Sequence, residues 1–177
     1  MTAKHRVILS ALAVLAVCSF IFFMSAQPAD ESSVMSNSIF DIVVGIFIPD
    51  YNLLDADEQL IKKSQLTHII RKLAHFTEFA VLGVTILNLL YQIAKANLSG
   101  EQETGKHFES NRYIPLAGKI PVAWLLATLY AATDEFHQLF VPGRGGLITD
   151  VCIDSAGVLT GVLITAAIIA FKQRKSS

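Results

Sequence analysis

Residues 7–24, VILSALAVLAVCSFIFFM, form an apolar stretch without a single charged side chain. A helix rises about 1.5 Å per residue and the hydrocarbon core of a bilayer is about 30 Å thick, so a membrane-spanning helix needs about 20 mostly apolar residues. A signal peptide is the alternative, but its apolar core is shorter, roughly 7–15 residues, and Met24-Ser25-Ala26 is a poor cleavage site. We therefore predict a retained first membrane span over residues 7–26.

Three further apolar stretches have the length of a membrane span, and we predict spans at residues 73–94, 121–141 and 151–171. The composition agrees, because 53% of the residues are hydrophobic and only 16% are charged, whereas a soluble domain carries about 25% charged residues. These values exclude a disordered chain, a coiled coil and a disulfide scaffold. The predicted fold is all-α, a polytopic membrane protein with four transmembrane helices in a single domain, residues 1–177.

The region between the first two spans has a different pattern. Residues 39–48 are apolar but too few to cross a bilayer, so we expect them to lie in the membrane interface or to enter and return. Asp55 and Glu58 then have the spacing of a helix start, and apolar residues at helical spacing follow up to Leu73. This pattern predicts an interfacial, amphipathic helical segment that continues directly into the second span. Residues 97–119 are polar, which predicts a loop.

Charge gives the expected orientation and excludes one class of partner. With a cytoplasmic N-terminus, most of the 14 lysine and arginine residues lie on the cytoplasmic side, as the positive-inside rule requires. We therefore expect a multi-pass protein of the plasma membrane with both termini in the cytoplasm. The net charge is −1, which gives no general affinity for nucleic acid.

Polar residues of three predicted spans are expected at one membrane face, because successive spans run in opposite directions. Arg71, His75 and Glu78 share one helical stripe, since they are spaced i, i+4, i+7. Asp134 and Gln138 share a stripe on the next span. The candidate pocket residues are Arg71, Lys72, His75, Glu78, Asp134, Glu135, His137, Gln138, Arg144, Asp150 and Asp154.

The position of these charges in apolar helices makes them informative. A charged side chain at the bilayer centre costs roughly 2.5–3.5 kcal/mol on insertion scales, so the carboxylates must pair, become protonated or face water. Arg144 has the planar guanidinium that holds a carboxylate through two hydrogen bonds. We expect Asp150 to orient Arg144, and Arg71 and Arg144 to hold either the facing acids or an anionic ligand.

Two motifs in this cluster resemble those of a known family. Residues 71–79, RKLAHFTEF, resemble the R-K-x-x-H-x-x-E-[YF] signature of VanZ-like membrane proteins. DEFHQ at residues 134–138, followed by VPGR and Asp150, resembles their second signature, D-E-x-x-Q…P-x-R…D. With Gly157 and Gly161, which match the glycines that commonly follow, the resemblance covers about residues 71–161.

The resemblance implies a role at the cell envelope but no particular reaction. The family is named for a protein associated with low-level resistance to the glycopeptide antibiotic teicoplanin. An influence on teicoplanin susceptibility, a form of antibiotic resistance, is therefore what the resemblance implies for this chain. Asp154 departs from the family pattern, because many members carry asparagine at the matching position.

Three interpretations of the polar cluster stay open. The first is an outward-facing pocket for an amphiphile among the membrane lipids, such as a lipid-linked envelope precursor or a lipoglycopeptide. The second is a purely structural ion-pair network between the spans. The third is an intramembrane enzyme that uses acid/base or metal chemistry on a lipid-linked substrate. Because H-E-x-x-H, G-x-S-x-G and phosphate-loop motifs are missing from the sequence, we assign no catalytic residue and expect no metal and no cofactor. The sequence does not predict the oligomeric state.

Overall fold

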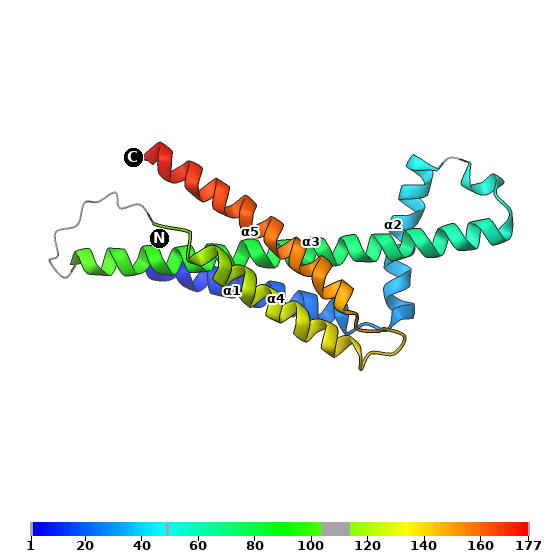
Figure 1. Ribbon diagram of the computed structural model, residues 1–177, viewed down its shortest axis with the longest axis horizontal. Helices are drawn as coiled ribbons and strands as arrows, with labels where there is room; N and C mark the ends of the chain where they lie inside the picture. The colour runs from blue at the N-terminus through cyan, green and yellow to red at the C-terminus, as the bar shows by residue number, and fades with distance from the viewer. Residues whose placement is uncertain (1, 49, 104–113, 177) are drawn as a thin grey trace.

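The computed structural model describes residues 2–48, 50–103 and 114–176, and in these residues every regular element is helical, which confirms the predicted all-α class. The chain begins at α1 and ends with α5, and a short 3-10 turn, η1, precedes the longest helix (Figure 1). The elements are α1 (Ala3–Ser25), α2 (Ala29–Phe47), η1 (Tyr51–Leu53), α3 (Ala56–Glu103), α4 (Lys119–Gln138) and α5 (Ile148–Ser176).

Three of the described helices are long and apolar enough to cross a membrane, namely α1, α3 over residues 56–99, and α5 over residues 148–175. The remaining predicted span, at residues 121–141, corresponds to α4, which does not reach the same apolar character. Asp134, Glu135 and His137 all lie in its last two turns and reduce its hydropathy. A protein with three candidate spans is therefore what the structure supports, and a fourth crossing stays a prediction.

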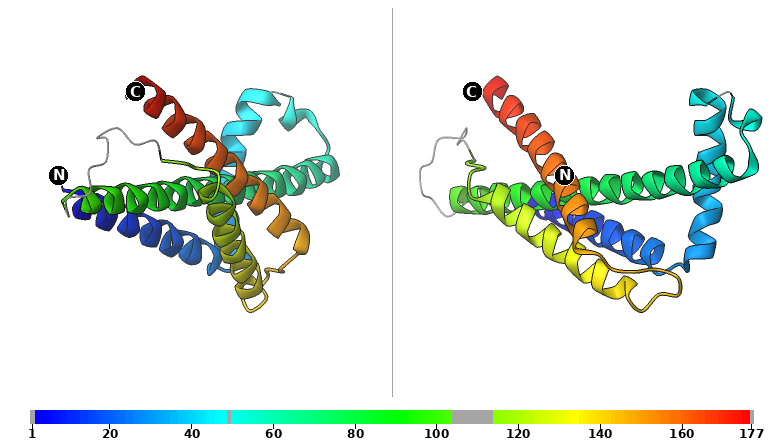
Figure 2. Two further views of the ribbon diagram at one scale, coloured as in Figure 1. Left: turned by 60° about the vertical axis from the view of Figure 1, so that its left-hand side comes forward. Right: turned by 45° about the vertical axis from the view of Figure 1, so that its right-hand side comes forward.

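Helix α3 is the central element, because α1, α4 and α5 all pack against it. Figure 2 shows α5 crossing α3 on one side while α1 runs along it on another. Both termini lie at one end of the bundle, and the α1–α2 and α4–α5 connections lie at the other (Figure 1). The fully buried residues of the core are Ile21, Phe79, Leu82, Leu87, Ala123, Ala127, Ala131, Val158 and Val162.

Glycines bring the backbones of α3 and α5 into contact. A Cβ atom added to Gly161 would overlap the backbone carbonyl oxygen of Ala80, and one added to Gly157 would overlap that of Phe76. Small residues at this four-residue spacing are the usual way for membrane helices to approach closely. The fixed α3–α5 contact holds the first turns of α5 beside the middle of α3.

We expect Gly161→Ala to destabilise the protein, because the methyl group meets main-chain atoms that cannot rotate away. Overpacking of this kind costs about 1–3 kcal/mol. Gly45→Ala on α2 is the matched control, since an added Cβ there meets nothing within 4 Å. Thermal unfolding of the purified protein in detergent measures the difference. Equal unfolding midpoints for the two variants would contradict the close packing of α3 on α5.

The predicted helix start at Asp55 is confirmed, because its Oδ1 accepts a hydrogen bond from the backbone N–H of Glu58 at 2.8 Å. From there α3 continues to Glu103, so the amphipathic segment and the second span are one helix, as predicted. The predicted loop at residues 97–119 is wrong in its first part, where α3 continues through a stretch rich in Glu and Gln, which are good helix formers. Residues 104–113 of that loop lie outside the described residues.

Candidate functional site

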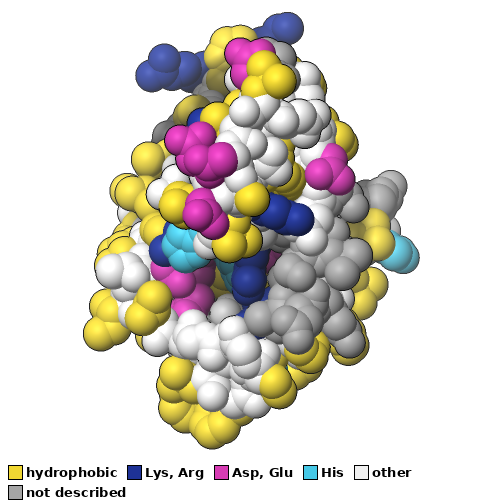
Figure 3. Space-filling model, turned by 90° about the vertical axis from the view of Figure 1, so that its right-hand side faces the viewer, with side chains coloured by type: hydrophobic (Ala, Val, Ile, Leu, Met, Phe, Trp, Pro, Cys, Tyr) yellow, Lys and Arg dark blue, Asp and Glu magenta, His cyan; other side chains and the backbone are white. Residues whose placement is uncertain are grey.

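A cavity of about 300 Å³ lies between α3, α4, α5 and the α4–α5 loop, at the end of the bundle opposite the termini. Figure 3, which views this end, shows histidine, basic and acidic side chains gathered around a hollow near the centre of the face. Eight of the predicted site residues line the cavity. They are Arg71, Lys72, His75, Glu135, Gln138, Arg144, Asp150 and Asp154.

The cavity runs from an exposed rim to a buried polar floor. His68, Gly143 and Gly145 are exposed lining residues and mark the rim. Glu135 is 6% exposed and Asp154 only 1%, and these carboxylates mark the floor. A concave site with convergent polar groups at its base is the usual form of a ligand-binding pocket.

The position of Arg144 is fixed by a tight turn after α4. The Arg144 backbone N–H donates to the carbonyl oxygen of Val141 at 3.1 Å, with Pro142 and Gly143 between them. Gly143 has φ of 73°, the left-handed conformation that a type II turn requires at this position and that glycine adopts without strain. The V-P-G-R sequence is therefore the local reason that a guanidinium lies at the cavity.

The Arg144 side chain is only partly satisfied. Its Nη2 donates to the carbonyl oxygen of Met24 at 3.0 Å, whereas its buried Nε and Nη1 have no hydrogen-bond partner among the described residues. Burial lowers the pKa of the Arg144 guanidinium from its usual value, and the nearby charge of Arg71 acts in the same direction. An arginine keeps its proton under such conditions, so two positive charges lie close together.

The Arg71 side chain has even fewer polar partners than that of Arg144. Within residues 2–48, 50–103 and 114–176, its side chain makes no hydrogen bond and no ion pair. The ion pair found there joins Lys72 and Asp150, whose Nζ and Oδ1 atoms lie 2.5 Å apart. The expectation that Asp150 orients Arg144 is therefore wrong. Lys72 on α3 faces the first turn of α5 and pairs with the Asp150 carboxylate, which was predicted to orient Arg144.

On the floor, Glu135 and Gln138 connect α4 to the following loop. Glu135 Oε2 accepts a hydrogen bond from the Leu147 backbone N–H at 3.1 Å. Gln138 Nε2 donates to Asp134 Oδ2 at 3.1 Å and lies 3.4 Å from Glu135 Oε1. These bonds explain how Glu135 can be buried, because each carboxylate oxygen has a partner.

Asp154 and His75 are different, because their buried polar atoms are unsatisfied. Neither carboxylate oxygen of Asp154 accepts a hydrogen bond from any residue that the structure describes, and His75 Nδ1 likewise has no partner there. Buried polar side chains are almost always hydrogen-bonded, since an unmet group costs free energy. Both residues line the cavity, where a bound molecule can supply the missing partner.

Three predicted site residues do not line the cavity. Asp134 is buried beside α1, where its Oδ2 accepts a hydrogen bond from Ser25 Oγ at 2.7 Å. His137 stacks on Phe22 of α1, with ring centroids 4.8 Å apart. Glu78 is half-buried on α3 and lies outside the lining. The structure therefore divides the predicted cluster into a cavity and a contact with α1.

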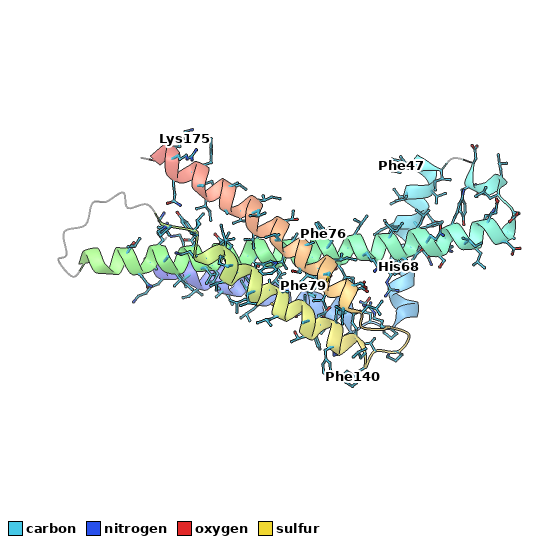
Figure 4. All side chains as sticks on the ribbon, in the orientation of Figure 1. Phe47, His68, Phe76, Phe79, Phe140 and Lys175 are labelled. Carbon is cyan, nitrogen blue, oxygen red and sulfur yellow. The ribbon has the colours of Figure 1, made fainter. Side chains whose placement is uncertain are left out.

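Two features of the site are not predicted from the sequence. His68 lines the cavity rim, and Figure 4 shows it on the part of α3 where α2 crosses. Its position one turn before Arg71 and two turns before His75 was a signal that could have identified it. The end of α1 also supports the site through Met24 and Ser25. A lone serine at the end of an apolar span gives no comparable signal.

Chemically, the arrangement is suited to recognition of polar groups. In the part of the chain that the structure describes, no group of three His, Cys, Asp or Glu residues is placed to hold a metal ion. The cavity instead offers guanidinium N–H donors, one buried unpaired carboxylate and an imidazole nitrogen. Donors and acceptors in one small cavity can bind a headgroup and fix its orientation.

Comparison with known proteins covers almost the whole chain. A family model described as VanZ/LLP1 matches residues 10–170, which include α1 from Ser10 onward and every residue of the cavity. No curated protein and no solved structure matches the chain significantly.

Proposed function

The chain belongs to the VanZ/LLP1 family, and on that premise we propose that its cavity binds the anionic headgroup of an amphiphile in the membrane. A lipid-linked envelope precursor or a lipoglycopeptide has the required chemistry, and binding either one would influence teicoplanin susceptibility. One observation carries the proposal: Arg71 and Arg144 line the same cavity, and neither forms an ion pair within the described residues. A phosphate or carboxylate would satisfy both guanidiniums.

A purely structural ion-pair network explains less of the geometry. Such a network would pair the arginines with the acids of the cluster, yet the ion pair present in the described residues uses Lys72 and Asp150. Glu135 and Asp134 are occupied by hydrogen bonds to a backbone N–H and to Ser25. The two arginines are therefore left without an ion pair in the described residues, which favours a ligand.

The position of the cavity suits a membrane ligand. Helix α3 has 48 residues and is therefore about 70 Å long, more than twice the hydrocarbon thickness of about 30 Å. Helix α2 crosses α3 near the cavity end and exposes Ile42, Ile46 and Phe47, at 62%, 67% and 75% (Figures 1 and 4). We place α2 in the membrane interface, α4 as a fourth crossing, and the cavity at the outer face of the plasma membrane, with both termini in the cytoplasm.

Titration of the purified protein with short-chain lipids tests this function. We expect dihexanoyl phosphatidylglycerol to bind saturably, and dihexanoylglycerol, which lacks the phosphate, to bind at least about tenfold more weakly. A tenfold difference corresponds to about 1.4 kcal/mol, less than one charge-assisted hydrogen bond contributes. Native mass spectrometry or fluorescence competition measures both. Equal binding of the two lipids would mean that the arginines do not select an anion, and the proposal would fail.

A further inference from the structure

Asp154 has hydrogen-bond acceptor atoms that an anionic headgroup alone would leave without a donor. Its side chain is 1% exposed, and both carboxylate oxygens lack a hydrogen-bond partner in the described residues. An ionised carboxylate is an acceptor only, with about four acceptor sites, and burying it without donors is costly. Because Asp154 lines the cavity, the missing donors can come from a bound ligand.

The surroundings of Asp154 are acidic. The charged groups that influence it are Glu135, Asp134, Asp150 and Glu78, and all four are carboxylates. Arg144, in contrast, has a second guanidinium near it, that of Arg71, as well as the carboxylates of Asp134, Glu78 and Glu135. The cavity therefore has two guanidiniums close to each other and, around the Asp154 carboxyl group, a set of acidic side chains.

The charge balance of the lining argues against a ligand with only negative charge. Three basic residues, Arg71, Lys72 and Arg144, face three acidic ones, Glu135, Asp150 and Asp154, so their formal charges cancel. Lys72 and Asp150 satisfy each other, and Glu135 is held by Leu147 and Gln138. The charged lining groups that have no ion pair and still have unbonded nitrogen or oxygen atoms are the guanidiniums of Arg71 and Arg144 and the carboxylate of Asp154, within the described residues. A ligand that matches them carries an anion and a cation together.

We propose that the headgroup bound in this cavity is zwitterionic, with an anion held by Arg71 and Arg144 and a primary ammonium group held by Asp154. The inference rests on the proposed function and names the class of amphiphile, one in which a phosphate is joined to an ammonium group by a short spacer. An ammonium group offers three N–H donors to the unoccupied acceptor sites of the Asp154 carboxylate, whereas a hydroxyl group offers one donor. His75 Nδ1 gives the same cavity a further hydrogen-bonding atom.

Three lipids with the same acyl chains test the proposal on the wild-type protein. Dihexanoyl phosphatidylethanolamine carries the phosphate and the ammonium, its N-acetylated form has lost the positive charge, and dihexanoyl phosphatidylglycerol has hydroxyls instead. We expect the first to bind at least about tenfold more tightly than the other two. Equal or tighter binding of phosphatidylglycerol would overturn the zwitterion but leave the anion site intact. Failure of all three to bind would remove both proposals.

A variant assigns the ammonium preference to one residue. Asp154→Asn keeps the size of the side chain and removes its charge, so the preference for phosphatidylethanolamine over phosphatidylglycerol should fall from about tenfold to about one. Asp57→Asn at the exposed start of α3 is the control and should keep the wild-type ratio. A tenfold preference retained by Asp154→Asn would overturn the assignment. If that variant does not fold, the comparison of the three lipids on the wild-type protein still decides.

Discussion

Replacing Arg71 by glutamine is expected to weaken binding of dihexanoyl phosphatidylglycerol by about 10- to 100-fold while leaving thermal stability unchanged. A hydrogen bond to a charged group contributes about 1.5–3 kcal/mol, and each 1.4 kcal/mol is a factor of ten in Kd. Stability should not change, because the Arg71 side chain makes no hydrogen bond or ion pair with the described residues. Titration and thermal unfolding of the same preparation measure the two effects.

Two further variants separate a local effect from a general one. Arg174→Gln removes an equivalent charge from the exposed end of α5, far along the helix from the cavity, and should bind lipid as the wild type does. Arg144→Lys keeps a positive charge but loses the planar fork, so its affinity should lie between those of the wild type and Arg71→Gln. An Arg71→Gln protein that unfolds earlier than the wild type, with unchanged affinity, would make Arg71 structural.

Teicoplanin susceptibility gives the corresponding test in cells. Arg144→Ala should remove any resistance that the wild-type protein confers, at an unchanged amount of protein in the membrane. If the variant protein instead disappears from the membrane, the loss of its hydrogen bond to Met24 has destabilised the α1 contact. That outcome would favour the structural interpretation.

The sequence predicted the all-helical class and the shared face of Arg71 and His75 because both follow from periodicity. An uncharged stretch of the length of residues 7–24 has few alternatives to a helix in a membrane, and α1 covers it from Ala3 to Ser25. Residues at i, i+4 and i+7 share a helical face whatever the tertiary structure. Arg71 and His75 accordingly line the cavity together.

The pairing of charges across helices could not be predicted in the same way, because it depends on rotation and depth. Lys72 and Arg144 were equally good partners for Asp150 in sequence, and only the packing of α5 on α3 decides for Lys72. The exclusion of His137 from the cavity has the same origin. Its face of α4 turns toward Phe22 on α1, an element whose sequence carries no charge near that contact.

The largest effect on stability is expected for Asp134→Ala, because the buried Ser25 hydroxyl would lose its acceptor and Gln138 Nε2 would keep only its 3.4 Å contact with Glu135 Oε1. Asp134 is 4% exposed, and its Oδ2 receives hydrogen bonds from Ser25 Oγ at 2.7 Å and Gln138 Nε2 at 3.1 Å. Each buried donor left without a partner costs about 1–3 kcal/mol. The variant should therefore unfold at a clearly lower temperature in detergent, and its amount in the membrane should fall.

A double-mutant cycle assigns that loss to the contact between α1 and α4. Ser25→Ala removes the donor on α1, so combining it with Asp134→Ala should cost less than the sum of the single effects. Asp57→Ala, at an exposed carboxylate, is the control and should unfold as the wild type does. Additive losses in the cycle would mean that the bond from Ser25 does not hold α1 to α4. An Asp134→Ala protein with wild-type stability and lost lipid binding would instead place Asp134 in the binding site, and the division between cavity and α1 contact would be wrong.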